Sequence, residues 1–389
     1  MKRHLSDDED NHSPQLDPPK SRQKVTLLQI VHVNSIQRAA LDFDHSHQCS
    51  VSLATVNVYC CLVCGKYLQG SSHGSPAFIH AVENGHHLYV ALDDITFKIL
   101  PEGDTLSDET ALRAVDDIAK SLNPPMQIDG KELKTLIANV PYIPGLVGLT
   151  GDASAYNVII QLLAHIPKIR DYYRHPRAGK LETEFRFVVR QLWSPYLLRN
   201  HVSPHRLIQA VKKPTDNPIT AYTTLVNRLD KETKDHGSIW RETLRGEVDG
   251  ADKPIPFWYL LLDVLAPQIG SDDVLEVQFE ELFETKYGEK GKYSIKKLPP
   301  ELLVVLNRKH DSQTRVVVSL PSQIIIKDQT YCLVSVISQK AQSWVYSGET
   351  PSGDWSTFDG VKVSQCPRQV IYLEDNRLLL WRRVPSPQE

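Results

Sequence analysis

The segment CLVCGKYLQGSSHGSPAFIHAVENGHH, residues 61–87, decides how the first part of the chain folds. It opens with a Cys-x-x-Cys pair, Cys61 and Cys64, and carries His80 and His86 six residues apart near its end. Two thiolates on a tight turn and two imidazoles on a following segment supply the N and S ligands that structural Zn²⁺ prefers. Because four protein ligands leave no open position for water, we expect one zinc ion that holds the fold and performs no chemistry.

The surrounding residues, 25–105, are dense in Cys and His and contain short β-rich runs. Cys49 and His73 lie nearby and remain alternative ligands, whereas we expect Cys60 to be a small buried residue. A redox Cys-x-x-Cys of the thioredoxin type would need a βαβ context, which the pattern lacks. At about 80 residues a hydrophobic core alone is marginal, and a bound metal adds the missing stability.

Composition places the whole chain among ordinary globular proteins. Of its 389 residues, 41% are hydrophobic and 23% charged, which predicts two or three domains and excludes a wholly disordered or fibrous chain. The formal net charge of −3 argues against nucleic-acid binding by bulk electrostatics. No run of 18 apolar residues predicts a membrane helix, and the first residues lack a secretory apolar core. We therefore expect a reducing compartment, with cysteines free or bound to metal.

Four regions follow from the pattern along the chain. Residues 1–24 are polar and Pro-rich and are predicted to be a disordered tail, followed by a finger over residues 25–105. Residues 106–140 are predicted to be a linker with one helix over residues 109–122. Residues 141–386 form a second domain whose first half is helical, over 154–166, 181–193, 203–211 and 220–235, and whose second half is strands, beginning with 274–287 and 301–309. Helices first and strands afterwards predict an α+β fold.

The helix predicted at residue 154 has the clearest periodicity. Its apolar positions form an i, i+3, i+4 stripe typical of a helix that buries one face: Ala155, Val158, Ile159, Leu162 and Leu163. Asp152 and Ser154 precede or open this stripe, and either side chain could cap the helix.

The first domain resembles the zinc finger of ubiquitin proteases, the UBP-type finger. The stretches LDFDHSHQCSVSLATVNVYCCLVCGKYLQG (41–70) and FIHAVENGHHLYVAL (78–92) carry the likeness. The resemblance assigns Cys61, Cys64, His80 and His86 to one of the family's zinc sites. Ser52 and Ile30 stand where a second site would need Cys, so one zinc is implied. Many such fingers bind the free Gly-Gly end of ubiquitin through an Arg; here Lys66, followed by Tyr67, stands there, and lysine lacks the planar fork that grips a carboxylate.

The segment LVGLTGDASAYNVIIQLLAHIPKIRDYY (146–173) resembles the opening of a ubiquitin-specific protease domain, which has a papain-like fold. Gly148-Leu149, Asn157 and Gln161 match the family, and Ser154 stands at the position of its nucleophilic Cys. The chain has no Cys between Gly65 and Tyr331. The resemblance therefore implies that the nucleophile is lost, because a cysteine protease needs a thiolate.

The family's second motif is degenerate as well. Ser343 stands at the position of the general base and Gln339 at that of a preceding His, and no His follows His310. The motif Trp355…Phe358-Asp359 keeps the orienting carboxylate, Asp359. An orienting Asp without a base or a nucleophile catalyses nothing, so the resemblance implies a pseudo-protease.

The likeness is strongest to the catalytically silent branch of this family that acts in pre-mRNA splicing. YIPGLVGL, HVSPH and KLPPELLVVLNRK carry it. This branch implies a nuclear scaffold that assembles or stabilises the tri-snRNP, with spliceosomal proteins as partners, snRNA as a candidate nearby contact and no membrane role. The alternatives are a ubiquitin-binding adaptor, although Lys66 makes tight tail binding unexpected, and an active deubiquitinating hydrolase using Ser154.

Overall fold

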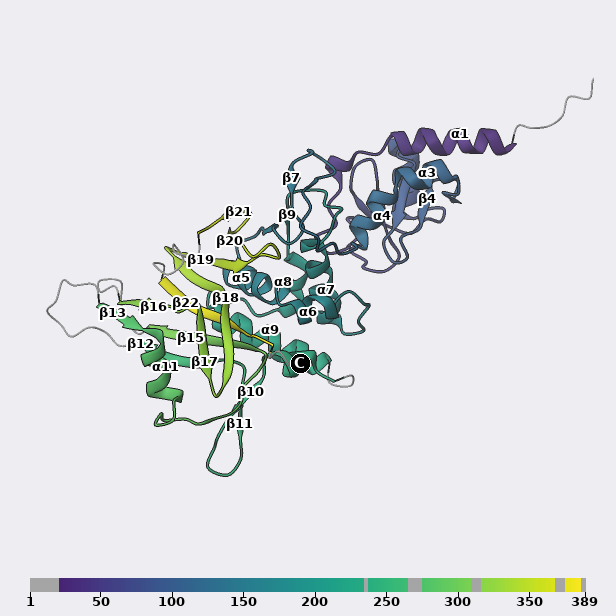
Figure 1. Cartoon of the computed structure of the whole chain (residues 1–389). Coiled ribbons are helices and arrows are strands. Elements are labelled where there is room, and N and C mark those ends of the chain that lie inside the picture. Colours follow the sequence, from purple (N-terminus) through teal and green to yellow (C-terminus); the bar gives the residue numbers. More distant parts are fainter. Residues whose placement is uncertain (1–20, 234–236, 265–274, 309–315, 368–374, 386–389) are drawn as a thin grey trace, which may run out of the picture. The chain divides into compact units, whose positions relative to one another are not determined.

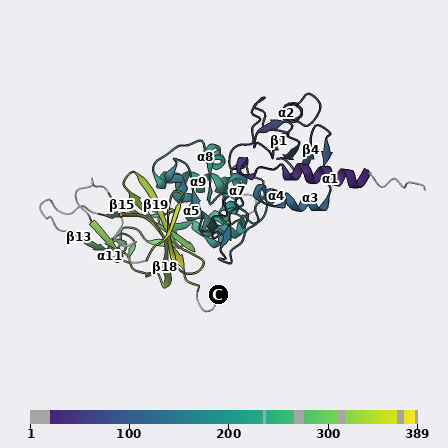
Figure 2. The ribbon, with the colours of Figure 1, turned by 90° about the horizontal axis from the view of Figure 1, so that it is seen from above.

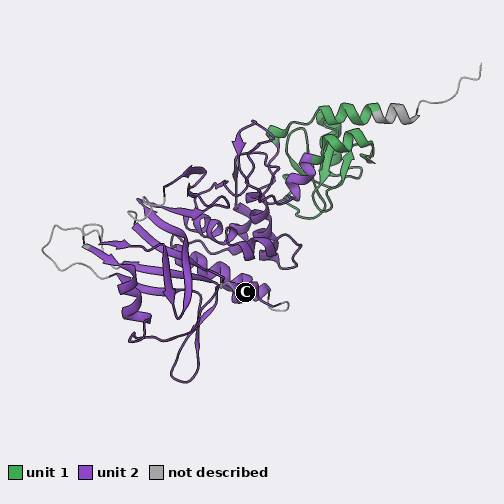
Figure 3. Cartoon of the chain, viewed as in Figure 1, with its two compact units in different colours: residues 1–40, 48–116 green, residues 41–47, 117–389 purple. Residues whose placement is uncertain are grey.

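A computed structural model describes residues 21–233, 237–264, 275–308, 316–367 and 375–385. The chain forms two compact units, residues 1–40 with 48–116 and residues 41–47 with 117–389 (Figure 3). The first 20 residues of the predicted disordered tail lie outside the described part, and helix α1 begins at Ser21, inside the range predicted for that tail. The second unit takes residues 41–47 out of the range predicted for the finger. The predicted domain boundaries themselves stay predictions.

The first unit is built on an antiparallel sheet of five short strands in the order β2-β1-β3-β4-β5. Its elements are α1 (Ser21–Asn34), a 3-10 turn (Arg38–Ala40), β1 (Val58–Cys61), β2 (Tyr67–Gln69), α2 (Pro76–Asn84), β3 (Leu88–Ala91), β4 (Phe97–Ile99), β5 (Asp104–Thr105) and α3 (Glu109–Ala114). A small core packs beneath α2, made by Tyr59, Leu68, Ala77, Ala81, Tyr89 and Leu100.

Local sequence sets the ends of the helices here. Pro76 occupies the first turn of α2, where its missing N–H costs nothing, and Gly85 ends the helix with φ of 66°. The single helix predicted over residues 109–122 is wrong: α3 ends at Ala114 and α4 (Asp116–Leu122) starts anew. Val115 between them has φ of −110° and ψ of 2°, outside the helical region.

The first half of the second unit is helical, as predicted. Its elements are α4, β6 (Leu133–Lys134), β7 (Pro141–Tyr142), β8 (Gly148–Leu149), α5 (Ser154–Ala164), α6 (Pro167–Tyr172), α7 (Lys180–Leu192), β9 (His201–Val202), α8 (His205–Val211), α9 (Pro218–Glu232) and α10 (Ile239–Leu244). The Asn217 side chain caps α9 by accepting the N–H groups of Ile219 and Thr220. No helix among the described residues is long and apolar enough to cross a bilayer.

The second half is built on an eight-stranded sheet, with a three-stranded sheet, a two-stranded sheet and, among the described residues, one helix (Figures 1 and 2). Its elements are β10 (Gly246–Val248), β11 (Ile255–Phe257), β12 (Leu260–Val264), β13 (Leu275–Gln278), α11 (Phe279–Tyr287), β14 (Ile295–Lys297), β15 (Glu301–Arg308), β16 (Val316–Ser319), β17 (Gln323–Ile326), β18 (Gln329–Lys340), β19 (Ser343–Glu349), β20 (Trp355–Asp359), β21 (Lys362–Gln365) and β22 (Asp375–Arg383). The main sheet runs β12-β15-β22-β18-β19-β20-β21, with β17 paired to β18.

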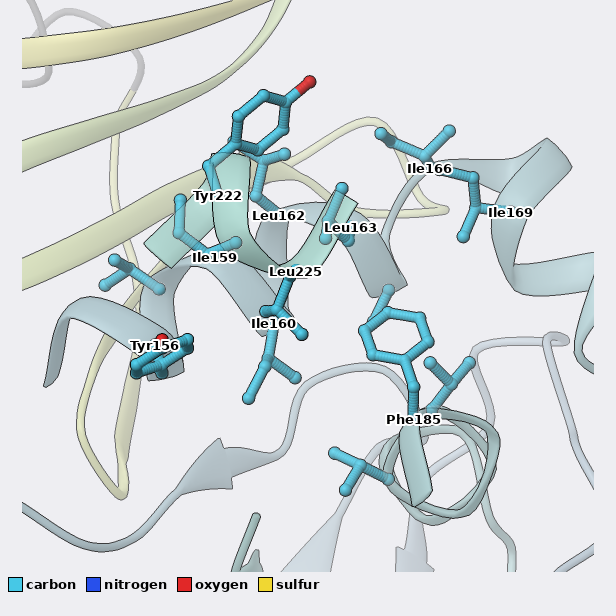
Figure 4. Packing of buried hydrophobic residues seen from close by; sticks show 14 of the residues in the cluster. Tyr156, Ile159, Ile160, Leu162, Leu163, Ile166, Ile169, Phe185, Tyr222 and Leu225 are labelled. Atoms are coloured by element: carbon cyan, nitrogen blue, oxygen red, sulfur yellow. The ribbon is translucent and has the colours of Figure 1, made fainter. Parts of the chain in front are cut away.

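Both faces of this sheet are covered. Along β15, Leu303 and Val305 join the core under the helices, whereas Leu302 and Val304 join a second core under α11. The alternation follows from the two-residue period of a strand. Helix α5 lies in the first core and is buried from Ala155 to Ala164 (Figure 4), and it packs against β19.

One segment predicted as a strand differs. Residues 274–287 were expected to be extended, but only β13 is a strand, and Phe279 begins α11. Phe279 and Phe283, four residues apart, face the sheet from one side of that helix, and Phe279 stacks near Trp381 with ring centroids 5.1 Å apart. Two aromatic residues spaced four apart favour a helix here, although the composition of the run is typical of a strand.

Candidate metal centre and degenerate protease site

The four predicted zinc ligands come from three neighbouring elements of the first unit. Cys61 ends β1, Cys64 lies on the turn after it, His80 is on α2, and His86 precedes β3. Gly65 closes the turn by donating its N–H to the Cys61 carbonyl at 2.8 Å. Gly65 has φ of +75°, and a Cβ there would lie 2.0 Å from the Ala40 carbonyl oxygen, so only glycine fits.

The donor atoms of these residues converge on one point. All four lie within 4.8 Å of one another, and no other group of three or more Cys, His, Asp or Glu in the described part of the chain does so. Cys61 Sγ is 3.6 Å from His86 Nδ1, Cys64 Sγ is 3.4 Å from His80 Nε2, and the two nitrogens are 3.1 Å apart. Tetrahedral Zn²⁺ with ordinary bond lengths places S and N ligands about 3.5 Å apart and N ligands about 3.3 Å apart. The donor set therefore fits zinc.

Electrostatics at the cluster favours a cation. Burial raises the pKa of the Cys61 thiol to about 11, so a bound positive ion is needed to keep its sulfur deprotonated at neutral pH. Burial and the neighbouring His86 lower the pKa of His80, which leaves its ring neutral and able to donate a lone pair.

A further residue lies against one ligand. The amide nitrogen of Asn84 is 3.1 Å from Nδ1 of His80, the ring nitrogen that points away from the cluster. The same amide nitrogen donates to the His80 backbone carbonyl at 3.1 Å, so Asn84 packs against the last turn of α2 beside the ligand. Asn84 was missed in the sequence, although its i+4 spacing from His80 on a predicted ligand segment was the available signal.

The alternative ligands lie elsewhere. His73 packs on Phe78 with ring centroids 4.9 Å apart, and it is outside the cluster. Cys49 is buried, and its Sγ accepts the N–H groups of Val51, Ser52 and Gln69 at 3.2–3.4 Å. Burial raises the pKa of Cys49, but hydrogen bonds led by that of Ser52 outweigh it and bring the pKa to about 7. The Cys49 thiol thus lies in a turn of the kind that holds a metal ligand, but it is not grouped with further Cys or His ligands in the described part of the chain.

Ser154 occupies the first position of α5. The N-cap is Ala153, which makes no side-chain cap, so the expectation that Asp152 or Ser154 caps this helix is wrong. Asn157 and Gln161 instead hold the preceding loop: their amide groups donate to the carbonyls of Thr150 and Val147. They fix the backbone leading to Ser154 and provide no acid or base.

Ser343 and Asp359 lie on adjacent strands of the main sheet, β19 and β20. Ser343 donates to the Lys340 carbonyl at 3.1 Å, and the Lys340 ammonium lies 3.0 Å from Asp359 Oδ2. Gln339, at the other His position, accepts from Arg377 at 3.1 Å. The backbone N–H of Leu149 donates to the carbonyl of Gly360, the residue after Asp359. The segment that leads into α5 therefore lies beside the end of β20. No pattern in the sequence predicts the contact between Lys340 and Asp359, because it depends on the hairpin between β18 and β19.

The described histidine nearest in sequence to Ser154 uses both ring nitrogens in contacts with backbone carbonyls. His165 is half-buried, and its two ring nitrogens lie 2.7 and 2.8 Å from the carbonyls of Gln161 and Gly145. Among the described residues no hydrogen bond joins Ser154, Ser343 and Asp359, and none links Ser154 to an imidazole. This arrangement offers no base for a serine nucleophile.

Comparisons with known proteins match both parts. A family described as "Zn-finger in ubiquitin-hydrolases and other protein" matches residues 49–111, which include all four ligands. The pre-mRNA-splicing factor SAD1 of Saccharomyces cerevisiae is 24% identical over 90% of this chain and 93% of its own length. The probable mRNA-splicing protein ubp10 of Schizosaccharomyces pombe and the ubiquitin carboxyl-terminal hydrolase 39 of Homo sapiens are each 34% identical, over 48% and 46% of this chain but only 38% and 35% of their own lengths.

Solved structures confirm the predicted fold class. The crystal structure of an essential yeast splicing factor matches with a TM-score of 0.81 and 23% identity, covering 91% of this chain and all of that one. A chain of the SAGA Ubp8/Sgf11/Sus1/Sgf73 DUB module matches with a TM-score of 0.50 and 16% identity, over 95% and 96% of the two chains. The fold is a UBP-type finger followed by an α+β body of the ubiquitin-specific protease type.

Proposed function

The chain is a SAD1-like splicing-factor relative with a UBP-type zinc finger, and from this relationship we propose that it is a non-catalytic scaffold of pre-mRNA splicing. The observation that carries the proposal is the match to SAD1 over nearly the full length of both proteins. A match of that extent includes the finger and the body together, so it concerns the whole chain and not a shared module.

The degenerate site supports the absence of catalysis. Ser154 at the helix start has no imidazole partner among the described residues, and the Asp359 carboxylate faces the Lys340 ammonium. A serine hydroxyl without a base is a weak nucleophile at neutral pH. What the fold retains is the frame of a protease, in which Asn157 and Gln161 brace the loop before Ser154.

The particle we propose as its partner is the tri-snRNP, whose assembly or stability the chain supports in the nucleus through protein contacts. In the finger, Cys61, Cys64, His80 and His86 would hold one Zn²⁺. The ion would supply cross-linking of β1, α2 and the start of β3, and no reaction.

Affinity purification of the tagged chain from nuclear extract tests this function. We expect tri-snRNP proteins to co-purify. Recovery of ubiquitin conjugates in their place, lost when the free Gly-Gly end of ubiquitin is removed, would favour the ubiquitin-binding adaptor.

A fluorogenic ubiquitin C-terminal amide tests catalysis separately. We expect release of the fluorophore at the rate of buffer alone. Turnover by the full chain that Ser154→Ala abolishes would contradict the proposal and identify an active hydrolase.

A further inference from the structure

A local excess of positive charge lies in the helical half of the second unit. Residues 168–190 contain seven Lys or Arg and three Asp or Glu, a local charge of +4 in a chain whose formal net charge is −3. These residues form α6, the following loop and most of α7.

The three acids of this segment are already engaged. Asp171 pairs with Arg170 at 3.1 Å and with Arg174 at 3.2 Å. Glu184 pairs at 2.9 Å with Arg206, which lies outside the segment. Glu182 is buried and accepts a hydrogen bond from the Tyr172 hydroxyl. None of the three forms a direct ion pair with the remaining arginines.

Three arginines remain, Arg177, Arg186 and Arg190, which we call the arginine patch. Each makes its hydrogen bond to a neutral oxygen: the carbonyl of Tyr172 at 2.6 Å, that of His175 at 2.9 Å and the amide of Asn123 at 2.7 Å. Within the ranges that the structure describes, no carboxylate lies within ion-pair distance of any of them. These three guanidinium groups therefore form no direct ion pair with a described carboxylate, although Arg177 lies close enough to Glu182 to act on the pKa of that carboxyl.

Two arginines of the patch lie on one helix, and the third lies in the loop before it. Arg186 and Arg190 are one turn apart on α7, which places their Cβ atoms about 5–6 Å from each other. The Arg177 guanidinium lies 3.5 Å from the centroid of the Tyr172 ring. Burial, and then repulsion by Arg186, lowers the pKa of Arg190 to about 10, and burial and Arg177 lower that of Arg186. Repulsion between neighbouring guanidinium groups contributes to the lowered pKa values of Arg186 and Arg190, and a bound anion would relieve that repulsion.

The surroundings of the patch favour one kind of anion. Protein partners dock on apolar anchors ringed by polar groups. Among the described residues, the large exposed hydrophobic side chains all lie outside residues 113–254. A row of guanidinium groups without an apolar centre suits the phosphates of a nucleic-acid strand, since backbone contacts are mainly electrostatic and come from Arg and Lys.

We propose that the arginine patch binds the phosphate backbone of RNA. This inference rests on the proposed function, because it gives a chain of the splicing machinery a surface for the RNA of that machinery. Guanidinium groups match phosphate oxygens through two parallel N–H donors, and three of them contact the backbone without reading its sequence.

Fluorescence anisotropy with a labelled 20-nucleotide oligouridine tests the proposal on the full chain. The triple variant R177Q/R186Q/R190Q removes the charges and keeps side-chain amides. The matched control K296Q/K297Q/K362Q removes three exposed lysines of the same unit. We expect the patch variant to weaken binding at least tenfold. The slope of log affinity against log salt should fall by about 2, since each single-strand phosphate contact contributes about 0.7. The control should stay near the wild-type affinity.

Other outcomes overturn the proposal. One is no measurable RNA binding by the wild-type chain; another is an equal loss in the lysine control. Equal binding of a polyglutamate of the same length would identify an acidic protein segment as the ligand. If the glutamine variant fails to fold, the variant R177K/R186K/R190K, which keeps the charge, replaces it and must retain the wild-type slope of log affinity against log salt. In the wild-type chain itself, a slope smaller than about 2 contradicts the patch. Because tri-snRNP co-purification is measured separately, a wild-type chain that co-purifies with the tri-snRNP but does not bind the RNA refutes only the patch.

Discussion

The Asp359 carboxylate, for which the resemblance implied an orienting role, lies 3.0 Å from the ammonium of Lys340. An imidazole beside it could accept a proton from a nucleophile, whereas an ammonium group has no lone pair to accept one. Both side chains are exposed, so their contact is a surface ion pair that contributes little to stability.

Cys49 and His86 provide a matched pair of single substitutions at the finger. We expect about one Zn²⁺ per wild-type chain, much less in His86→Ala, and an unchanged content in Cys49→Ser, because only His86 belongs to the converging donors. Elemental analysis after dialysis against a weak chelator measures this. A content near two in the wild type, or zinc loss in Cys49→Ser, would contradict the single site.

Glu301 makes stability depend on pH. Burial raises its pKa to about 7, against the opposing effect of Arg382, and its Oε2 has no partner. Since the folded chain keeps a proton that the unfolded chain releases, the stabilisation is full below the ordinary carboxyl pKa and is lost as pH rises through about 7.

We therefore expect the free energy of unfolding to fall between pH 5 and pH 8 more in the wild type than in Glu301→Gln. The glutamine can still accept a hydrogen bond from Arg382, which lies 2.6 Å from the wild-type carboxylate. Urea unfolding at the two pH values measures the difference. If the unfolding free energy changed equally in both proteins, the prediction would be wrong, and the ionised Glu301 carboxylate would be better stabilised in the folded chain than its burial implies.

Residues 41–47 act as a strap within the second unit. Leu41 and Phe43 are buried, and the Asp44 carboxylate accepts hydrogen bonds from the Gln191 amide at 2.6 Å and the Ser203 N–H at 2.8 Å. The strap thus ties α7 to the chain just before α8. Alternating apolar residues, LDFD, supply the two anchors.

Asp44→Ala should loosen the strap. It leaves the donors of Gln191 and Ser203 unpaired, at a cost of about 1–3 kcal/mol in unfolding free energy. Asp42→Ala, which alters ion pairs at the surface, should cost about 0–1 kcal/mol. Denaturant unfolding compares the two, and hydrogen exchange at residues 41–47 should rise only in the Asp44 variant. Equal costs would mean that the strap contributes little.

At the level of the entire chain, the two units should lose structure separately. The finger has a small core and relies on metal, whereas the body has two large cores around one sheet. All six tryptophans lie in the body, at positions 193, 240, 258, 344, 355 and 381. Their fluorescence therefore reports on the body alone.

We expect a strong chelator to remove hydrogen-exchange protection from residues 58–91 and to leave tryptophan fluorescence and its denaturation midpoint unchanged. His86→Ala should behave in the same way without a chelator. A shift of the tryptophan midpoint after metal removal would show that the two units unfold together.

Short-range features of the sequence were enough for several conclusions. The Cys-x-x-Cys spacing with two histidines picked out the four side chains whose donor atoms converge, because turns and short helices fix such distances locally. The apolar stripe of α5 predicted its helix, and the absence of Cys and His at two motif positions predicted a missing nucleophile and base.

Contacts between distant residues decided the rest. The strap joins the second unit through Asp44 and Gln191, 147 positions apart, and Asp359 meets Lys340 only because β19 brings their strands together. Residues 279–287, predicted as part of a strand, form a helix because Phe279 and Phe283 pack on the sheet. The arginine patch is visible only once the partner of each acid is known. Spacing along a chain encodes local geometry, whereas burial and ion pairing depend on which segments the folded core brings together.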